Sequence, residues 1–378
     1  MDFEPSDDQR LLLESVSRML TDTYSFAQRK TFIAAPEGYS TAMWSRFAEQ
    51  GLLGLPFPEE YGGYGGGAQE TMLVMQEFGK ALVVEPFLAT VVLAGTAIQA
   101  GGTAEQKKTL LTAIAEGSLK MAFAHAERQA RYDLTDVVTS AKRDGNDWIL
   151  DGSKTVVAHG DAADKFVVSA RTSGDRYDRD GITLFIVDVF DQGVARRSYA
   201  TRDETRAADI SLSNVRVDAA NVLGAEGKGL EIVERVIDAG IAATAAEMVG
   251  AMEAMNNMTL EYAKTRVQFG APIGTYQVVQ HRLADMFMTQ EQGRSMAMLA
   301  TMMVDEADPA ERRHNMAMAK VGVGQAGRYV AQSAVQMHGG IGMTEEYAVG
   351  HYFRRAMVIE RLFGDPAYYL QRLADEVA

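Results

Sequence analysis

The chain has 378 residues, of which 47% are hydrophobic and 23% charged, a mix typical of soluble globular proteins with two or three domains. Its formal net charge of −14 disfavours nucleic acid or an anionic membrane surface as the main partner, although local arginines still allow an anionic ligand. It has no cysteine, which excludes disulfides, thiolate catalysis and cysteine-ligated metals, and we predict no metal site.

The start of the chain, MDFEPSDDQR, is acidic and has no apolar run, unlike a secretory signal peptide. No segment offers about 18 uninterrupted apolar residues, the minimum for a membrane-spanning helix. We therefore expect a cytoplasmic protein that does not bind a membrane.

The first third of the chain predicts a helical domain, residues 1–118. Ser6 and Gln9 have the spacing of a capping box, and so do Thr103 and Gln106. A glycine- and proline-rich stretch, PFPEEYGGYGGG, interrupts the helical spacing. Apolar residues at helical spacing cover residues 44–53, 70–84, 88–99 and 103–115.

The middle of the chain, residues 119–225, is rich in short β-type runs separated by Gly, Asp and Asn. Strands at such close spacing, without helix-length segments between them, predict an antiparallel barrel or sandwich rather than a parallel α/β fold. The runs are KMAFAHA, DWILDG, TVVAHG, KFVVSAR, GITLFIVDV and ADISLSNVRV.

The last part, residues 226–378, is helical again, with long helices and short connections that predict an up-down four-helix bundle. The fold class is therefore α+β, mostly α: an N-terminal helical domain, a middle β domain and a C-terminal bundle. The expected long helices cover residues 228–264, 275–304, 309–338 and 344–361, and a short one follows Pro366.

A loop between the first two bundle helices carries several polar and aromatic side chains. A planar guanidinium suits bidentate recognition of a phosphate, and the glycines and proline here let the backbone turn tightly. The loop is equally consistent with an ordinary helix corner bearing an exposed arginine. The residues of interest are Arg266, Gln268, Phe269, Tyr276 and Gln277.

A second stretch, QMHGGIGMTEEY, begins at Gln336 after a long helix. Its paired glycines, Gly339 and Gly340, let a ligand or a backbone approach closely, but they also suit a simple helix end. No strand precedes them, so this is not the phosphate loop of an α/β nucleotide-binding fold.

Taken together, these stretches resemble signatures of the acyl-CoA dehydrogenase family. RVQFGAPIGTYQVVQHRLADM is similar to R-x-x-F-G-x-x-I…Q-x-x-x-x-x-L-A-D-M, QMHGGIGMTEEY to Q-x-x-G-G-x-G-x-x-x-E, and PFPEEYGGYGG to P-E-x-x-G-G-x-G. The resemblance covers essentially the whole chain. It is greatest to small subunits of heteromeric members, such as the pimeloyl-CoA dehydrogenase small subunit and the steroid side-chain enzymes.

The resemblance implies an FAD-dependent enzyme of fatty acid or steroid side-chain β-oxidation, which converts an acyl-CoA to the trans-2-enoyl-CoA. In the family, a carboxylate removes the α-proton while hydride leaves the β-carbon for the flavin N5. Electron-transfer flavoprotein or a similar acceptor is the implied redox partner. The residues that match FAD-binding positions are Arg266, Gln268, Phe269, Tyr276, Gln277, Gln336, Met337, His338, Gly339 and Gly340.

In the family these contacts often reach the FAD of a neighbouring subunit. The resemblance therefore implies either a homo-oligomer or an α2β2 heterotetramer with a large subunit.

The catalytic base is where the chain departs from the family. The two positions where relatives carry the base are occupied by Phe363 and Gly240. Glu247 lies two helical turns beyond Gly240, on the same helix face and among apolar neighbours, and burial there would raise its pKa toward neutrality. We therefore predict Glu247 as the base. The alternatives are a structural acid paired with an arginine, or a solvent-facing helix residue.

The β domain departs from the family as well. AFAHAERQARYD stands where relatives have Y-x-x-T-E-P-x-x-G-S-D, with His125 near the threonine position. VVAH stands where they have W-I-T/S-N/S, so Val156 and Ala158 replace an indole and a hydroxyl. We predict His125 and Ala158 as flavin contacts, and His159 is a further candidate. Both histidines are equally consistent with surface positions.

Three hypotheses follow. The leading one is a catalytic acyl-CoA dehydrogenase subunit acting on a bulky or carboxylated acyl chain. The second is a non-catalytic small subunit that completes the FAD site of a catalytic large subunit. The third is a flavin-free binding or oligomerisation module on the same fold.

Overall fold

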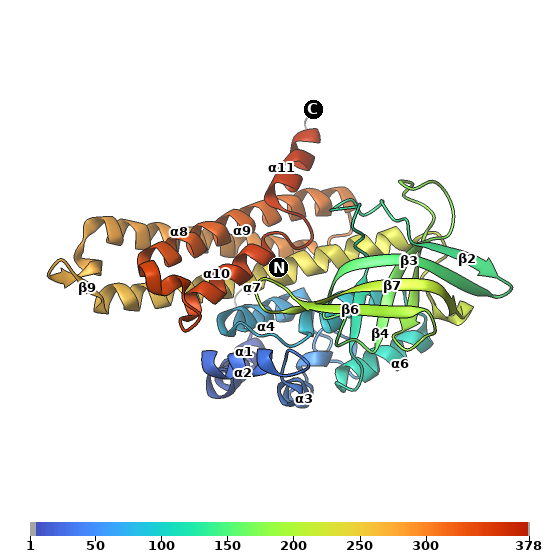
Figure 1. Cartoon of the computed structure of the whole chain (residues 1–378), viewed down its shortest axis with the longest axis horizontal. Helices are drawn as coiled ribbons and strands as arrows, with labels where there is room; N and C mark the ends of the chain where they lie inside the picture. Colours follow the sequence, from blue (N-terminus) through green and yellow to red (C-terminus); the bar gives the residue numbers. More distant parts are fainter. Residues whose placement is uncertain (1–4, 377–378) are drawn as a thin grey trace. The chain divides into compact units, whose positions relative to one another are not determined.

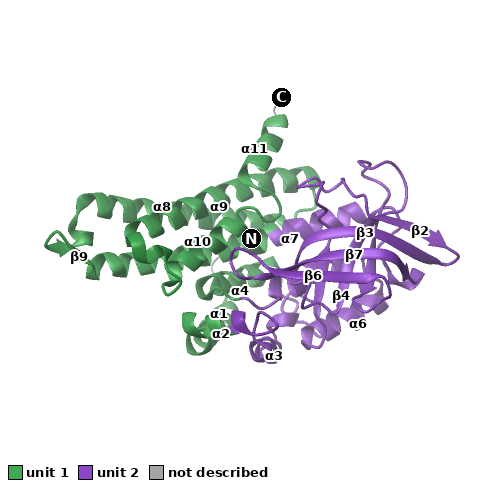
Figure 2. Cartoon of the chain, in the orientation of Figure 1, with its two compact units in different colours: residues 1–31, 68–83, 241–378 green, residues 32–67, 84–240 purple. Residues whose placement is uncertain are grey.

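The computed structural model describes residues 5–376, which form two compact units (Figures 1 and 2). Unit 1 comprises residues 1–31, 68–83 and 241–378, and unit 2 comprises residues 32–67 and 84–240. The first four residues of the acidic start lie outside the described residues. No helix in residues 5–376 is long and apolar enough to cross a membrane.

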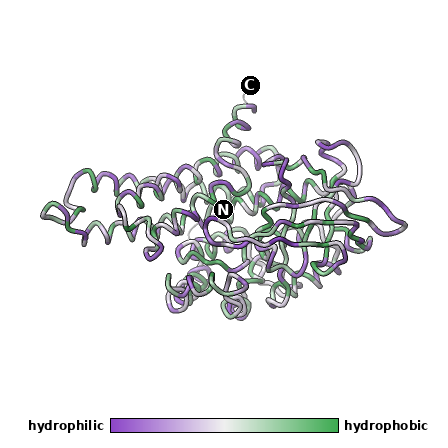
Figure 3. The backbone as a smooth tube through the Cα atoms, viewed as in Figure 1, coloured by the Kyte–Doolittle hydropathy of each residue, from purple (hydrophilic) through white to green (hydrophobic). Residues whose placement is uncertain are grey.

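Unit 1 is helical, and hydrophobic and hydrophilic residues alternate along its helices (Figure 3). Within it α1 packs against α4, and α8, α10 and α11 pack against α9. The four long helices and the short one after Pro366 are confirmed within a few residues. The bounds are α1 (Asp7–Thr23), α4 (Ala68–Ala81), α7 (Gly229–Thr265), α8 (Gln277–Met303), α9 (Pro309–His338), α10 (Ala348–Ile359) and α11 (Pro366–Asp375).

The predicted capping boxes are confirmed at the start of two helices. At α1 the Gln9 N–H donates to Ser6 Oγ at 3.2 Å, and the Ser6 N–H donates to Gln9 Oε1 at 2.9 Å. Thr103 and Gln106 make the same reciprocal pair before α6 (Ala104–Ala115) in unit 2. Local side-chain chemistry therefore fixes both helix starts.

Two helices of unit 1 touch through their backbones. A Cβ at Gly79 in α4 would lie 2.0 Å from the Glu247 carbonyl oxygen in α7. A Cβ at Gly250 in α7 would lie 1.9 Å from the Gln76 carbonyl oxygen in α4. This close crossing fixes the segment of α7 that carries Glu247.

Unit 2 combines short helices with a sheet of eight strands in the order β6-β7-β3-β2-β4-β5-β8, with β1 beside β4. Its other helices include α3 (Thr41–Glu49), a π-helical turn at Leu88–Ala94 and α5 (Gly95–Gly101); α2 (Phe26–Ala34) crosses from unit 1 into unit 2. The strands are β1 (Met121–Ala124), β2 (Ser140–Asp144), β3 (Asp147–Ala158), β4 (Lys165–Arg171), β5 (Ile182–Asp188), β6 (Val194–Ala200), β7 (Arg206–Val217) and β8 (Val222–Leu223).

The sheet confirms the predicted β domain and corrects its details. DWILDG and TVVAHG belong to one strand, β3, which pairs antiparallel with β7 and has irregularities near Gly152 and Val157. β1 pairs parallel with β4, although most pairings are antiparallel. Strands β2 and β6 were not predicted, because SAKRD and VARRSYA are mostly polar and lack a clear alternation. The division into three domains at residues 118 and 225 stays a prediction.

Candidate functional site

The loop after α7 forms a small hairpin in unit 1. It consists of β9 (Val267–Gln268) and β10 (Ala271–Pro272), with Phe269 at the turn at φ 54° and 95% exposed. The Tyr276 hydroxyl donates to the carbonyl oxygens of Gln268 at 3.0 Å and Phe269 at 3.3 Å. These hydrogen bonds stabilise the conformation of the hairpin, and the Phe269 ring at its turn is exposed to solvent.

The charged and amide side chains of this hairpin are available to a ligand. Arg266 and Gln277 are exposed, and the Arg266 guanidinium has no hydrogen-bond or ion-pair partner in residues 5–376. The Arg266 backbone is held, because its N–H donates to the Tyr262 carbonyl oxygen at 2.8 Å. A fixed backbone with a free guanidinium suits an anionic group such as a phosphate.

His338, at the end of α9, lies in an aromatic cluster beside the hairpin's base. Its ring stacks on Tyr262 at 4.5 Å and lies 5.0 Å from the Tyr347 ring, measured between centroids. Nδ1 lies 2.8 Å from the Ala334 carbonyl oxygen and therefore donates, which leaves Nε2 as a buried acceptor that has no partner in the described part of the chain. Burial lowers the pKa of His338, so the ring is neutral.

The glycines after His338 leave open space. A Cβ at either Gly339 or Gly340 would meet no atom within 4 Å, and Gly339 has φ 64°. Gln336 is exposed and Met337 half-buried on the last turn of α9. The structure therefore brings the two predicted motifs together through Tyr262, whose ring touches His338 and whose carbonyl holds Arg266.

Glu247 is buried, as predicted, but it is paired with an arginine. Arg355 in α10 donates from Nε to Glu247 Oε1 at 2.6 Å and from Nη2 to Oε2 at 2.7 Å. Glu247 is 3% exposed and Arg355 9% exposed. Both carboxylate oxygens therefore accept charge-assisted hydrogen bonds. This is the structural acid paired with an arginine, the alternative to a free base.

Glu247 does not share a site with the hairpin of its own chain. Arg266 follows Glu247 by 19 positions along α7, which at 1.5 Å per residue is about 28 Å. If both groups serve one ligand-binding centre, the hairpin acts on a neighbouring chain.

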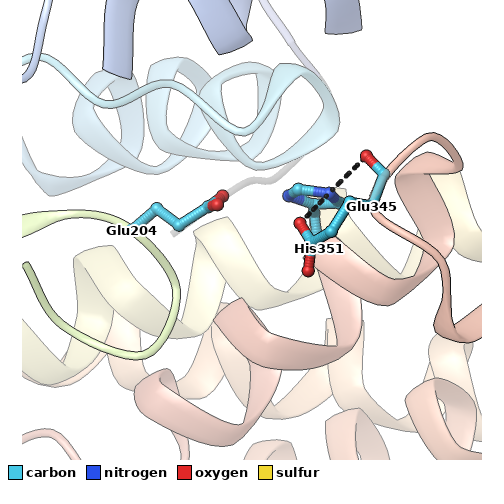
Figure 4. Close-up of side chains that lie close together, drawn as sticks. All are labelled: Glu204, Glu345 and His351. Carbon is cyan, nitrogen blue, oxygen red and sulfur yellow. Dashed lines mark hydrogen bonds and ion pairs between the residues drawn. The ribbon is translucent and has the colours of Figure 1, made fainter. Parts of the chain in front are cut away.

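A further histidine of unit 1, His351, contributes to packing between helices. His351 Nε2 lies 3.5 Å from a carboxylate oxygen of Glu345 (Figure 4). An Arg354 guanidinium nitrogen, Nη2, lies 2.9 Å from His351 Nδ1. The Phe26 ring meets the imidazole edge-on at 4.7 Å, and Arg29 Nη1 lies 3.5 Å from Nδ1. These contacts join α10 to the α1–α2 segment within unit 1.

In unit 2, His125 lies at the end of β1 in a buried polar cluster. Its Nδ1 is 2.9 Å from Ser169 Oγ, and Lys154 Nζ is 3.0 Å from the same oxygen. Lys154 also donates to Glu127 Oε1 at 2.7 Å. Burial, and then the charge of Lys154, lower the pKa of His125 to about 3. Burial by itself would raise the pKa of Glu127, but Lys154 outweighs it and brings that pKa to about 2.

The end of β3 is strained. Val156 has φ 53° and His159 has φ 47°, a region that β-branched and bulky residues rarely occupy. Val156 is exposed and Ala158 half-buried, whereas His159 is buried and donates from Nε2 to the Val84 carbonyl oxygen at 2.9 Å. Such strain gathers at functional sites.

Sequence reasoning missed three kinds of residue. Arg355, the partner of Glu247, lies 108 residues away and carries no local signal. The Lys154–Ser169 pair joins β3 to β4, so only the sheet brings these side chains together. Tyr262 looked like an ordinary helix residue. Ser169 in KFVVSAR carried a usable signal, because a polar residue within a strongly apolar strand indicates a buried hydrogen-bond partner.

Comparisons with known proteins now decide the family. Three family models match the chain in order: the N-terminal domain of acyl-CoA dehydrogenases over residues 6–118, the middle domain over 122–215 and the C-terminal domain over 227–378. The chain belongs to the acyl-CoA dehydrogenase family. It is an oxidoreductase, and its α+β fold is that of the family.

Individual relatives extend over the full length of this acyl-CoA dehydrogenase. It is 32% identical to Probable acyl-CoA dehydrogenase YngJ of Bacillus subtilis, over 99% of this chain and 98% of the relative. The butyryl-CoA dehydrogenase structure from Megasphaera elsdenii superposes with TM-score 0.91 at 29% identity, covering 100% of both chains. The ChsE4–ChsE5 complex from Mycobacterium tuberculosis contains a chain with TM-score 0.88 at 26% identity, covering 100% of this chain and 99% of the other.

Proposed function

We propose that this acyl-CoA dehydrogenase oxidises an acyl-CoA thioester to the trans-2-enoyl-CoA with FAD as its cofactor. The observation that carries the proposal is a set of groups in unit 1 that have no partner among residues 5–376. They are the Arg266 guanidinium, the open backbone at Gly339 and Gly340, and the buried acceptor of His338. The residues present therefore fit a ligand with both phosphates and hydrogen-bond donors, as FAD has.

A bound FAD supplies the acceptor for the hydride that leaves the β-carbon. The chain itself supplies position, exclusion of water and a base. The α-proton of a thioester is weakly acidic, so its removal needs a carboxylate at close range. Of the three positions considered, Phe363 and Gly240 have no proton acceptor, which leaves Glu247 as the candidate.

Glu247 acts as the base in this proposal only when Arg355 releases one of its oxygens. Arg355 Nε and Nη2 each occupy a hydrogen-bonding position on one of the two Glu247 carboxylate oxygens. Substrate binding therefore has to open the pair before the carboxylate can meet the α-proton.

Glu247→Gln tests the base. We expect loss of acyl-CoA-dependent reduction of an artificial electron acceptor, with the 450-nm flavin absorbance retained. The matched control is Glu261→Gln, an exposed glutamate on the same helix. Normal turnover in Glu247→Gln would remove Glu247 from the mechanism.

Arg266→Gln tests the cofactor site. Loss of a charge-assisted hydrogen bond to a phosphate should weaken FAD binding by roughly 10- to 100-fold. Arg361→Gln changes another exposed arginine, outside the two motifs, and should bind FAD normally. Equal FAD affinities of the two variants would contradict the assignment.

The pairing of Glu247 with Arg355 also favours a second candidate function, a non-catalytic small subunit that completes a large subunit's FAD site. Both proposals require a multimer, because one chain separates Glu247 from its hairpin by about 28 Å along α7. Flavin counting separates them: one FAD per chain in the protein expressed alone indicates a catalytic homo-oligomer. Half an FAD per chain, obtained only with a large subunit, indicates the α2β2 arrangement.

A further inference from the structure

The junction of α9, α10 and α11 in unit 1 contains a buried lysine with a single hydrogen bond. Lys320, in α9, is 4% exposed, and its Nζ donates at 2.7 Å to the carbonyl oxygen of Ile359, the last residue of α10. No other hydrogen bond reaches its amino group within residues 5–376. An ammonium group has three donors, so a charged Lys320 leaves two of them unused.

Directly after α10, Glu360 carries an oxygen that no hydrogen bond satisfies. The residue is 1% exposed, and its Oε1 is ion-paired with Arg328 Nη2 of α9 at 2.5 Å. Its Oε2 is enclosed and has no hydrogen-bond partner in the described part of the chain. A buried carboxylate oxygen without a donor costs free energy, so this oxygen and the unused donors of Lys320 are complementary.

Lys320 and Arg328 lie on either side of Glu360 along one face of α9. They stand four residues before and four residues after Gly324, which is the spacing of one helix face. A Cβ at Gly324 would meet Pro366 Cγ at 3.0 Å and Glu360 Cγ at 3.5 Å. The stem of Glu360 therefore crosses α9 where that helix has no side chain, and its carboxylate has one cationic residue on each side.

Lys320 changes its charge near neutral pH. Burial lowers its pKa from 10.5 to about 7, while the carboxylates of Glu360 and Asp365 act in the opposite direction. Among the described residues, α8, which also packs along α9, adds no charged group that shifts this pKa. Asp365 is already used, because its Oδ1 accepts from the Tyr368 N–H at 2.9 Å at the start of α11. The acceptor that remains for a protonated Lys320 is Glu360 Oε2.

We propose that Lys320, Glu360 and Arg328 form a pH-sensitive switch at the end of α10. When Lys320 is neutral, Arg328 alone holds Glu360. When Lys320 is protonated, it binds the Ile359 carbonyl oxygen and Glu360 Oε2 together, and both cations then hold the carboxylate. A cation at the C-terminus of a helix also interacts favourably with the negative end of the helix dipole. The end of α10 is therefore held more firmly below neutral pH than above it.

The switch acts on two features next to it. The last turn of α10 begins at Arg355, the partner of Glu247. Beyond Glu360 the chain enters a strained turn, with Phe363 at φ 61° and Gly364 at φ 119°. A bulky residue at positive φ persists only where the surrounding contacts hold it, so a change at Glu360 affects this turn as well.

The exchange of partners is tested by NMR on the full-length chain labelled with ¹³C-lysine, with signals assigned by Lys320→Met. The ε-methylene signal of Lys320 should titrate near pH 7. Arg328→Gln releases Glu360 to Lys320 and should raise the midpoint by about one pH unit. The matched control is Arg361→Gln, which removes an exposed arginine next to Glu360 in the chain and should move the midpoint much less. Equal shifts in both variants, or a Lys320 that stays charged up to pH 9, would overturn the switch.

The effect on α10 is tested by hydrogen exchange of residues 355–365, corrected for the intrinsic pH dependence of exchange. The unaltered chain should exchange about tenfold more slowly at pH 6 than at pH 8, as one hydrogen bond to a charged group predicts. Lys320→Met should remove this difference, whereas the exposed Lys108→Met should keep it. Glu360→Gln should also remove it, and this variant decides the question if Lys320→Met does not fold.

Equal corrected rates at pH 6 and pH 8 in the unaltered chain would contradict the proposal. None of these measurements involves FAD or an acyl-CoA, so they decide the switch independently of the proposed function.

Discussion

At the scale of single residues, the Glu247–Arg355 pair sets the stability of unit 1 around α7. Removing one partner from a buried ion pair leaves an uncompensated charge and costs about 3–5 kcal/mol. We expect Arg355→Met to lower the free energy of unfolding by that amount. The double change Glu247→Leu with Arg355→Met should recover most of it, since no charge is then left buried.

Urea unfolding of the two single variants and the double variant measures this cycle. Independent, additive losses would mean that the pair does not interact in solution. That outcome would also leave Glu247 free to act as a base without any opening step, so the cycle bears on mechanism as well as on stability.

His125 and Glu127 make unit 2 sensitive to acid. The pKa of His125 falls from 6.5 to about 3 on folding, so between these values the unfolded chain binds a proton that the folded chain does not. Stability therefore declines as the pH falls below about 6.5, by up to about 1.4 kcal/mol per pH unit. The pKa of Glu127 falls from 4.5 to about 2 on folding, so this residue adds a further loss of stability as the pH falls below 4.5.

The measurement is the urea midpoint of unfolding from pH 7 to pH 4. His125→Phe should flatten the decline in stability between pH 6.5 and 4.5, because it removes the group that binds a proton in the unfolded chain but not in the folded chain. The exposed His281→Phe should leave the decline as it is. An unchanged slope in His125→Phe would show that other groups cause it.

Sequence reasoning placed single residues well when the signal was local. Ser6 and Gln9 were recognised as a capping box because both partners lie within one helical turn. Glu247 was expected to be buried because its neighbours are apolar, and it is. Its partner could not be foreseen, since two arginines in FRRA differ only in the helix face they occupy, which depends on tertiary packing.

At the scale of elements, α4 and α7 depend on glycine at their crossing. Gly79→Ala would place its Cβ 2.0 Å from the Glu247 carbonyl oxygen, a backbone atom that cannot turn aside. The helices have to separate, at a cost of about 1–3 kcal/mol or more. Gly340→Ala is the matched control for stability, because its Cβ would meet nothing within 4 Å.

Thermal unfolding of both variants shows whether the crossing limits stability. Near-equal midpoints would mean that α4 and α7 move apart freely, and that the position of Glu247 is less fixed than the structure indicates.

Secondary-structure elements were predicted best where they are long and periodic, as for α9. The run at 88–99 was predicted as one helix, but it begins with a π-helical turn, which helical periodicity does not distinguish from an α-helix.

At the scale of the whole molecule, α7 and α8 leave a hollow of about 580 Å³ in unit 1, lined in part by Leu260, Ala284 and Phe287. Phe287 is 60% exposed and Leu260 41% exposed. The rest of the lining is largely polar and includes Asn256, Glu291 and Arg294. An exposed aromatic group with polar side chains around it suits contact with another chain. This hollow is therefore the surface at which we expect the chains of the proposed multimer to meet.

Phe287→Glu tests this surface. A buried charge without a partner should break the contact, so light scattering after gel filtration should give a lower mass while circular dichroism stays unchanged. Phe190→Glu, at an aromatic residue of unit 2 that is 85% exposed, should leave the mass unaltered. Because each chain carries a formal charge of −14, copies repel one another, and higher salt should strengthen the assembly of the unaltered protein. An unchanged mass for Phe287→Glu at low salt, where repulsion is greatest, would place the contact elsewhere.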